Sequence, residues 1–201
     1  MLEIKCFVFG PFETNTYVVS DEHGKALLID PACLYANEQQ QLQVYLKGYT
    51  LQSIIATHGH LDHLWGAPWA CQQWSLPVRM HEADIPMAQA MQQQYDFFGI
   101  RAKAQPFPIE ALTDQPEPFT VIHTPGHTPG SVCLYWEEEK VLFSGDTLFH
   151  MGYGRTDLPG GDFYQLMDSL DKLFHLPDAT RVYPGHGEHT SLRSTSRSLL
   201  M

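Results

Sequence analysis

A strand-like apolar run that leads directly into a cluster of histidines constrains this 201-residue chain more than any other feature. The stretch ATHGHLDHLWG, residues 56–66, places three histidines and an aspartate within six positions, from His58 to His63. A single histidine is usually an ordinary surface or core residue, but four potential metal ligands in so short a segment need another explanation. The stretch therefore predicts a metal site at the point where a buried strand over residues 51–60 ends.

The spacing within this stretch indicates two metal ions rather than one. His58 and His60 are two residues apart at the end of an extended strand, so both side chains can point to the same side. Asp62 and His63 are adjacent and diverge, so this pair cannot easily serve the same ion as the first pair. The pattern differs from HExxH, in which two histidines on one face of a helix bind a single metal. We predict two ions side by side, one for each pair.

Further candidate ligands lie at turns elsewhere in the chain. His127 lies in a Pro/Gly turn between two predicted strands, and Asp146 and His186 each come directly after a strand. The three residues belong to separate loops, because 64, 19 and 40 residues separate them in turn, counted from His63 (127−63, 146−127 and 186−146). Loops at one edge of a rigid scaffold are where such side chains can converge.

The order of predicted elements is strands followed by helices in each half of the chain. A helix is expected over residues 82–95, and an irregular crossing segment over residues 96–118, which contain four prolines and little periodicity. Strands begin again at residue 119. Two such halves packed sheet on sheet, with helices outside, make an α/β fold of four αββα layers, and we expect residues 1–201 to form a single domain.

Charge and composition exclude several classes of protein. A formal net charge of −11 repels a nucleic-acid backbone, and the apolar runs are too short to cross a bilayer. The N-terminal sequence MLEIKCFVFG does not have the pattern of a signal peptide, so we expect a cytoplasmic protein without nucleic-acid or membrane partners. The four cysteines have no CxxC spacing and apolar neighbours, and are expected to be buried free thiols.

Several segments together resemble one known family. THGHLDH, PGHTPGS, SGDTLF and PGHG, in this order, are similar to motifs of the metallo-β-lactamase superfamily, as are FGPFETNTYVV and LLIDPA near the N-terminus. The resemblance implies the four-layer αββα metallo-β-lactamase sandwich. It also implies the metal ligands: His58, His60 and His127 for the first ion, Asp62, His63 and His186 for the second, and Asp146 as the bridge. Asp30, at the end of LLID, would brace the histidine loop from beneath.

The ligand set indicates the cofactor and the chemistry. Imidazole and carboxylate ligands without a thiolate suit zinc, iron or manganese, and two zinc ions are our first expectation. Such ions lower the pKa of bound water towards about 7 and so provide a metal-bound hydroxide as nucleophile. Asp62 is the expected catalytic residue, because its carboxylate can orient this hydroxide and move its proton. The predicted activity is hydrolysis of an ester-like bond.

The segment after Asp146, GDTLFHMGYGRTDLPGGD, resembles glyoxalase II-type proteins, which are hydroxyacylglutathione hydrolases. The resemblance places Arg155 at the acidic end of a glutathione thioester. Tyr153 is a candidate for the same pocket, and the alternative is that it only packs against the protein. Asp157 stands where the family has a substrate-binding tyrosine. Only 15 residues follow His186, so the helical C-terminal domain of the longer enzymes is not expected. We predict a short, single-domain thioesterase that acts on small S-acylglutathione-like thioesters.

Other functions remain open at this point. A persulfide dioxygenase would bind a single iron through His58, His127 and Asp146, and its sequences also carry GRTD, although PGHGEH is the hydrolase form of the last motif. A lactonase and a non-catalytic metal-binding module are further alternatives. Arg155 and Asp157 could instead form an ion pair that shapes their loop. The sequence gives no prediction of the oligomeric state.

Overall fold

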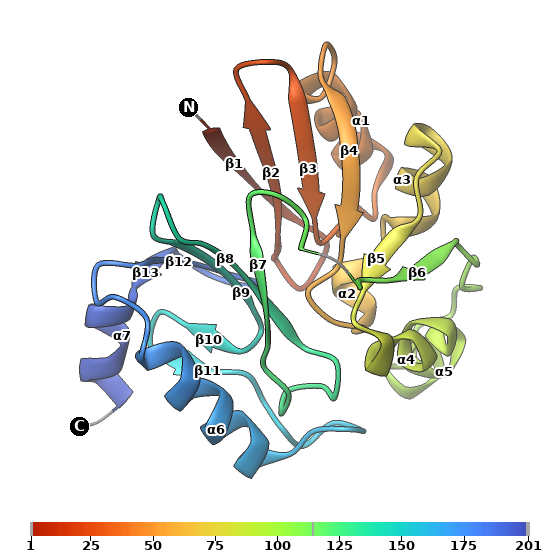
Figure 1. The fold of residues 1–201 in the computed structure, drawn as a ribbon. Coiled ribbons are helices and arrows are strands. Elements are labelled where there is room, and N and C mark those ends of the chain that lie inside the picture. The colour runs from red at the N-terminus through yellow and green to blue at the C-terminus, as the bar shows by residue number, and fades with distance from the viewer. Residues whose placement is uncertain (1, 114, 200–201) are drawn as a thin grey trace. The chain divides into compact units, whose positions relative to one another are not determined.

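The computed structural model describes residues 2–113 and 115–199 (Figure 1). The chain divides into two compact units, Met1–Ala111 and Leu112–Met201, and each is described by itself. The boundary between them lies inside the segment 96–118, which the sequence predicts to connect two halves. The expectation of a single domain stays a prediction.

The first unit is built on a six-stranded sheet with the strand order β1-β2-β3-β4-β5-β6. Its strands are β1 (Leu2–Phe9), β2 (Thr14–Asp21), β3 (Lys25–Ile29), β4 (Thr50–Ile55), β5 (Val78–Met80) and β6 (Ile109–Ala111). The pairs β1–β2 and β2–β3 are antiparallel, whereas β3–β4, β4–β5 and β5–β6 are parallel. Each parallel pair needs a crossover connection, and the helices of this unit supply these connections.

Helices pack on one face of this sheet. They are α1 (Ala36–Tyr45), α2 (Leu61–Leu64), α3 (Ala67–Trp74), η1 (Glu82–Asp84), α4 (Ile85–Gln89) and α5 (Met91–Phe97). The strand residues Val18, Leu28 and Ile54 share one buried core with Leu42 of α1 and Ala70 of α3. Alternate residues of a strand face the same side, so this core sits on one face of the sheet.

Three expectations about this unit are corrected. The strand predicted over residues 51–60 ends at Ile55, so His58 and His60 lie in the loop before α2 rather than on the strand. The single helix predicted over residues 82–95 is instead η1, α4 and α5, with a break at Ala90, whose φ of −86° and ψ of 26° are not helical. Pro86 favours a helix that starts at Ile85, because proline fits the first turn of a helix. The segment 96–118 also contains the strand β6, which is too short at three residues for its periodicity to be visible.

The second unit has a five-stranded sheet with the order β13-β12-β9-β8-β7 and a small hairpin, β10-β11. Its elements are β7 (Thr120–His123), β8 (Val132–Trp136), β9 (Val141–Gly145), β10 (Leu148–Phe149), β11 (Gly152–Tyr153), α6 (Phe163–Phe174), β12 (Arg181–Pro184), β13 (Thr190–Ser191) and α7 (Leu192–Leu199). Strands β9 and β12 are parallel neighbours, and α6 lies between them in the chain. Both strands therefore end at the same edge of the sheet.

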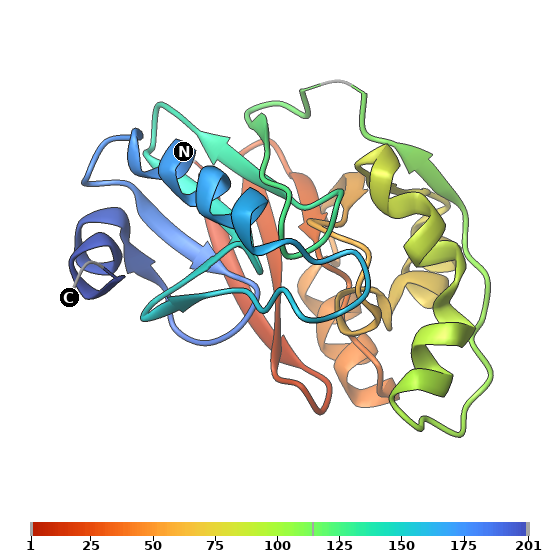
Figure 2. The same ribbon diagram turned by 90° about the horizontal axis from the view of Figure 1, so that it is seen from below.

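Helix α6 covers one face of this second sheet (Figure 2). Leu166, Leu170 and Leu173 recur at helical spacing and are buried in one cluster with residues of β8, β9 and β12. Burial of each leucine contributes roughly 2 kcal/mol. The helix begins at a capping residue, since the side chain of Asp162 accepts a hydrogen bond from the backbone N–H of Gln165 at 3.0 Å.

Within residues 2–113 and 115–199, no helix has the length and apolar character that crossing a membrane requires. The four cysteines are free thiols. Cys33, Cys71 and Cys133 are buried as expected, but the expectation is wrong for Cys6, which is exposed. Cys6 lies on β1, the edge strand of its sheet, where apolar neighbours in the sequence do not ensure burial.

Candidate metal centre

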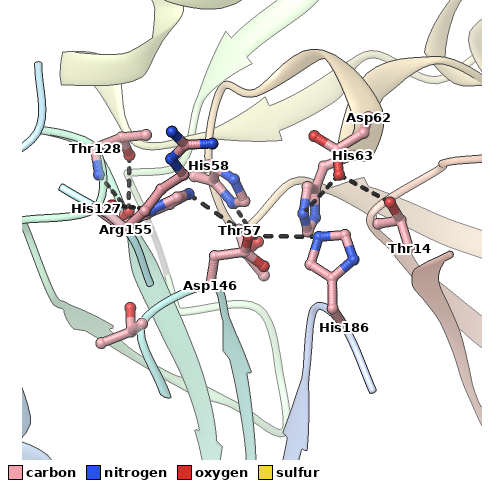
Figure 3. A network of polar contacts seen from close by, with 12 residues as sticks. Thr14, Thr57, His58, Asp62, His63, His127, Thr128, Asp146, Arg155 and His186 are labelled. Atoms are coloured by element: carbon pink, nitrogen blue, oxygen red, sulfur yellow. Dashed lines mark hydrogen bonds and ion pairs between the residues drawn. The ribbon is translucent and has the colours of Figure 1, made fainter. Parts of the chain in front are cut away.

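The loop between β4 and α2 carries His58 and His60, and α2 carries Asp62 and His63. Figure 3 shows His58, Asp62 and His63 from close by. All four are buried, with exposed fractions of 1% for His58, 9% for His60, 7% for Asp62 and 0% for His63. His58 has a ligand atom within 4.8 Å of one on His60, and also within 4.8 Å of one on His63. Oδ2 of Asp62 lies 3.5 Å from Nε2 of His63. The structure thus brings these four side chains together, as the stretch predicts.

A buried carboxylate, that of Asp30, supports this loop. Asp30 follows β3 with a φ of 52°, a left-handed conformation that aspartate tolerates better than most residues. Its Oδ1 accepts a hydrogen bond from the N–H of Thr57 at 2.7 Å, and its Oδ2 lies 3.0 Å from Nδ1 of His63. A carboxylate only accepts, so Nδ1 of His63 donates and the lone pair of this ring is on Nε2.

Thr57 orients the ring of His58 in a similar way. The hydroxyl of Thr57 donates to Oδ2 of Asp30 at 2.8 Å, and its oxygen lies 3.1 Å from Nδ1 of His58. Because the hydroxyl proton is directed to Asp30, Nδ1 of His58 is the donor in the second contact. The lone pair of His58 is then also on Nε2.

Thr14 and Thr57 contact candidate ligands, although the sequence analysis does not predict either of them as a site residue. Thr14, the first residue of β2, donates from Oγ1 to Oδ2 of Asp62 at 2.8 Å. Thr57 directly precedes His58, and this position next to the histidine cluster is a sequence signal that could have identified it as a supporting residue. Only the resemblance of the segment around Thr14 to the family could have drawn attention to that residue.

The loops of the second unit gather the other three candidate ligands (Figure 3). Asp146 follows β9 and His186 follows β12, and these parallel neighbours place both residues at the same sheet edge. Oδ2 of Asp146 lies 3.4 Å from Nε2 of His186 and 3.6 Å from Nε2 of His127. One carboxylate oxygen thus faces two imidazole nitrogens, which is the arrangement expected of a bridging ligand.

The backbone orients His127. Its Nδ1 lies 2.7 Å from the carbonyl oxygen of Arg155, and a carbonyl only accepts, so Nδ1 donates and the lone pair is on Nε2. Gly154 makes this approach possible. A Cβ at this position would overlap the carbonyl oxygen of Asp146 and come within 2.9 Å of Nδ1 of His127. The GYG segment therefore has a steric reason for its second glycine.

The side chain of Arg155 forms a two-point ion pair with Asp157. Its Nε and one terminal nitrogen donate to the two carboxylate oxygens at 2.7 and 2.6 Å, although both side chains are exposed. This pairing lowers the pKa of Asp157 from its ordinary 3.8 to about 2. Tyr153 is 41% exposed, and its ring centroid lies 6.3 Å from that of Phe163. A contact of Arg155 or Tyr153 with a substrate stays a prediction.

The donor set fits divalent transition metals. His58, His63 and His127 each have Nδ1 directed to an oxygen of the protein, and a histidine that binds a metal commonly has its other nitrogen held in this way. The candidate ligands are imidazoles and carboxylates, which suit zinc, iron and manganese alike. The geometry of each unit supports a metal site without selecting the ion.

Comparisons with known proteins agree with this geometry. The sequence pattern of the metallo-beta-lactamase superfamily matches residues 9–186. Similar proteins include a probable metallo-hydrolase, YqgX, of Bacillus subtilis, 35% identical over 91% of this chain and 89% of the relative. The hydroxyacylglutathione hydrolase GloC of Haemophilus influenzae is 31% identical over 98% of this chain and 96% of its own length.

Solved structures give the same result for the fold. TTHA1623 in a di-iron-bound form is similar with a TM-score of 0.86 and 35% identity, over 96% of this chain and 98% of that one. BLEG-1, a B3 metallo-beta-lactamase, is similar with a TM-score of 0.84 and 33% identity, over 96% and 95% of the two chains.

Proposed function

Because this chain belongs to the metallo-β-lactamase superfamily, a superfamily of metal-dependent hydrolases, we propose that it is a thioester hydrolase of the glyoxalase II type with two divalent metal ions. The family relationship covers residues 9–186 and thus includes every proposed ligand. The proposed substrates are S-acylglutathione-like thioesters. We also propose that it has no nucleic-acid partner, because a net charge of −11 repels a phosphate backbone. A cytoplasmic location and the absence of a membrane partner stay predictions.

The observation that carries the proposal is the orientation of the imidazole rings. In three of them the protein fixes Nδ1 as a donor, so that His58, His63 and His127 have their lone pairs on Nε2. In the second unit, Oδ2 of Asp146 lies 3.4 to 3.6 Å from Nε2 of two histidines. Metal binding needs one unprotonated nitrogen in each ring, and the partners of Nδ1 direct the lone pairs of these three rings to Nε2.

The proposed assignment of ligands to ions follows from the family resemblance. His58, His60 and His127 would hold the first ion, Asp62, His63 and His186 would hold the second, and Asp146 would serve both. Zinc is the first candidate, and the di-iron form of TTHA1623 supports iron as the alternative. When bound, the ions supply a hydroxide nucleophile at neutral pH and polarise the carbonyl of the substrate.

The residues of this chain then position the nucleophile and move its proton. Thr14 fixes the rotation of the Asp62 carboxylate through the hydrogen bond of 2.8 Å. We assign to Asp62 the orientation of the nucleophile and the transfer of its proton to the leaving thiolate. No serine or cysteine nucleophile is needed in this scheme. Arg155 and Tyr153 are the proposed contacts to the substrate, on the basis of the similarity of their segment to glyoxalase II.

Two paired measurements test the proposed function: metal ions per chain, and rates on a substrate panel. The panel contains an S-acylglutathione, a small neutral thioester, a lactone and a β-lactam, with oxygen uptake on glutathione persulfide as a separate assay. We expect close to two ions per chain and the highest kcat/KM on the thioesters. A higher kcat/KM on the β-lactam would instead assign the activity of BLEG-1. One tightly bound iron with oxygen uptake would assign a persulfide dioxygenase.

A further inference from the structure

The peptide groups of Gly59, between the histidines His58 and His60, are held on both sides by side chains from distant parts of the first unit. The N–H of Gly59 donates to Oδ2 of Asp84 at 2.7 Å. The carbonyl oxygen of Gly59 accepts a hydrogen bond from Nε2 of Gln94 at 2.9 Å. Asp84 belongs to η1 and Gln94 to α5, so two separate elements hold this glycine.

Gln94 makes three contacts with backbone groups. Its Oε1 accepts from the N–H of Leu61, the first residue of α2, at 3.0 Å. Its Nε2 donates to the carbonyl of Met87 at 3.0 Å as well as to that of Gly59. One amide side chain thus ties the histidine loop to the start of α2 and to α4. Only an amide can accept at one end and donate at the other in this geometry.

The loop also lies very close to η1. A Cβ on Gly59 would come within 3.0 Å of the carbonyl oxygen of Asp84 and 3.2 Å of Cβ of Met87. Asp84 is fully buried, with an exposed fraction of 0%. The glycine between the two histidines therefore has little room to shift, and its two hydrogen bonds have well-defined directions.

These contacts act on the residues that would share a metal ion. His58 and His60 are the neighbours of Gly59, and each has a ligand atom within 4.8 Å of the other's. The orientation of the peptide groups on either side of Gly59 determines where each neighbouring Cα–Cβ bond points. A rotation of these peptides would change the separation of the two rings even if neither histidine changed its rotamer.

We propose that Asp84 and Gln94 are positioning residues that set the separation of His58 and His60 and thereby the affinity of the first metal position. The inference rests on the proposed metal-dependent function. Under this proposal, one residue of η1 and one of α5 control metal binding by the histidine loop, although neither element carries a proposed metal ligand. The effect passes through the backbone of Gly59, so both residues act without contacting the ion.

The test compares Gln94→Glu with Gln93→Glu. The first substitution keeps the size and the acceptor for Leu61 but replaces the donor group with a second oxygen that faces the carbonyls of Gly59 and Met87. Gln93 is exposed on the same helix, so Gln93→Glu adds the same charge as a matched control. Zinc affinity is measured by chelator competition, and the cobalt-substituted proteins are compared by visible absorption spectra.

We expect the zinc affinity of Gln94→Glu to be weaker by about tenfold or more, the size typical of lost support around metal ligands. The visible spectrum of its cobalt form should change as well. Gln93→Glu should match the wild type in both measurements. Asp84→Asn, which retains an acceptor for Gly59, should lose less affinity than Asp84→Ala. If the two Asp84 variants do not fold, the Gln94 pair decides alone.

The melting temperature of the metal-free proteins separates positioning from general support of the fold. A lower melting temperature of Gln94→Glu with unchanged affinity and an unchanged cobalt spectrum would overturn the inference and leave the proposed function intact. A wild-type protein that binds neither zinc nor cobalt would overturn the proposed function, and this inference with it.

Discussion

Nδ1 of His63 lies 3.0 Å from Oδ2 of Asp30, and both side chains are buried, with exposed fractions of 0% and 1%. The same carboxylate accepts hydrogen bonds from the N–H and the hydroxyl of Thr57, which in turn contacts His58. One carboxylate therefore determines the orientation of two candidate ligands. This relationship leads to the first prediction.

Asp30→Asn should weaken metal binding by about 10- to 100-fold. The amide of asparagine has one acceptor oxygen and one NH2 group, whereas both oxygens of the Asp30 carboxylate accept hydrogen bonds. In the variant, the NH2 group would face a donor of His63 or of Thr57, and that donor would lose its acceptor. Chelator competition measures the loss. Asp171→Asn is the matched control, because Asp171 also lies beside a histidine, His175, but both are exposed. Equal affinities of the two variants would contradict the role proposed for Asp30.

Asp146→Ala should lose both ions, whereas His186→Ala should mainly weaken the second. The reason is that Oδ2 of Asp146 faces the nitrogens of two histidines, at 3.6 and 3.4 Å, while His186 would serve one ion. Elemental analysis after dialysis against a weak chelator measures the metal content of each variant. The bridging assignment fails if the two variants lose metal to the same extent.

Arg155→Ala distinguishes a substrate contact from a structural ion pair. If Arg155 binds a remote carboxylate of glutathione, the variant should lose about 1–3 kcal/mol of binding, seen as a higher KM for S-acylglutathiones with a smaller change in kcat. A small neutral thioester should be hydrolysed almost as before. The carbonyl that orients His127 belongs to the backbone and is retained in the variant.

The ion pair with Asp157 provides the control for this experiment. Asp157→Ala removes the ion-pair partner of Arg155 but leaves the positive charge of Arg155 in place. If Arg155 binds the substrate, the KM for S-acylglutathiones should therefore rise in Arg155→Ala and not in Asp157→Ala. Parallel kinetics on both substrates, with a melting curve for each variant, completes the comparison. Equal damage to the two substrates together with a lower melting temperature would exclude the substrate contact.

Alkylation of the native protein at pH 8 should modify Cys6 and spare the other thiols. Burial raises the pKa of Cys33 to about 12 and those of Cys71 and Cys133 to about 11, so their reactive thiolate forms are scarce at pH 8. Desolvation also raises the pKa of Cys6, but this thiol is exposed to the reagent, whereas the other three are buried. Mass spectrometry with iodoacetamide counts the modified sites. The proposed centre uses no thiolate, so modification of Cys6 should leave the metal content unchanged; a loss of metal would contradict the ligand set.

Much of the fold follows from the sequence because its strands are long and apolar. The fold class, the α/β fold of the metallo-β-lactamase superfamily, is confirmed by the family match and the solved structures. Strands such as β2 and β9 are buried and carry clear β-rich patterns. The sequence does not predict the short strand β6, because a strand of three residues shows no periodicity. It does not predict the break between α4 and α5 either, because the change of direction at Ala90 does not alter the hydrophobic periodicity.

In the candidate site, too, residues within recognisable sequence motifs can be predicted, whereas residues that reach the site from distant positions in the chain cannot. The histidine stretch and the three loop residues are recognisable from their types and their positions after strands. Thr14, Asp84 and Gln94 are not, because their contacts with the loop join residues 48, 25 and 33 to 35 positions apart. Threonine, aspartate and glutamine are common residues, and only the folded unit shows which of them support the ligands.

The metal content of the purified protein and of its Asp146→Ala variant, measured by elemental analysis, decides whether the protein has a dinuclear centre. We expect close to two transition-metal ions per wild-type chain and almost none in the variant, since the bridging carboxylate would serve both positions. A wild-type protein with a single tightly bound ion, or a variant that retains both ions, would contradict a dinuclear centre bridged by Asp146.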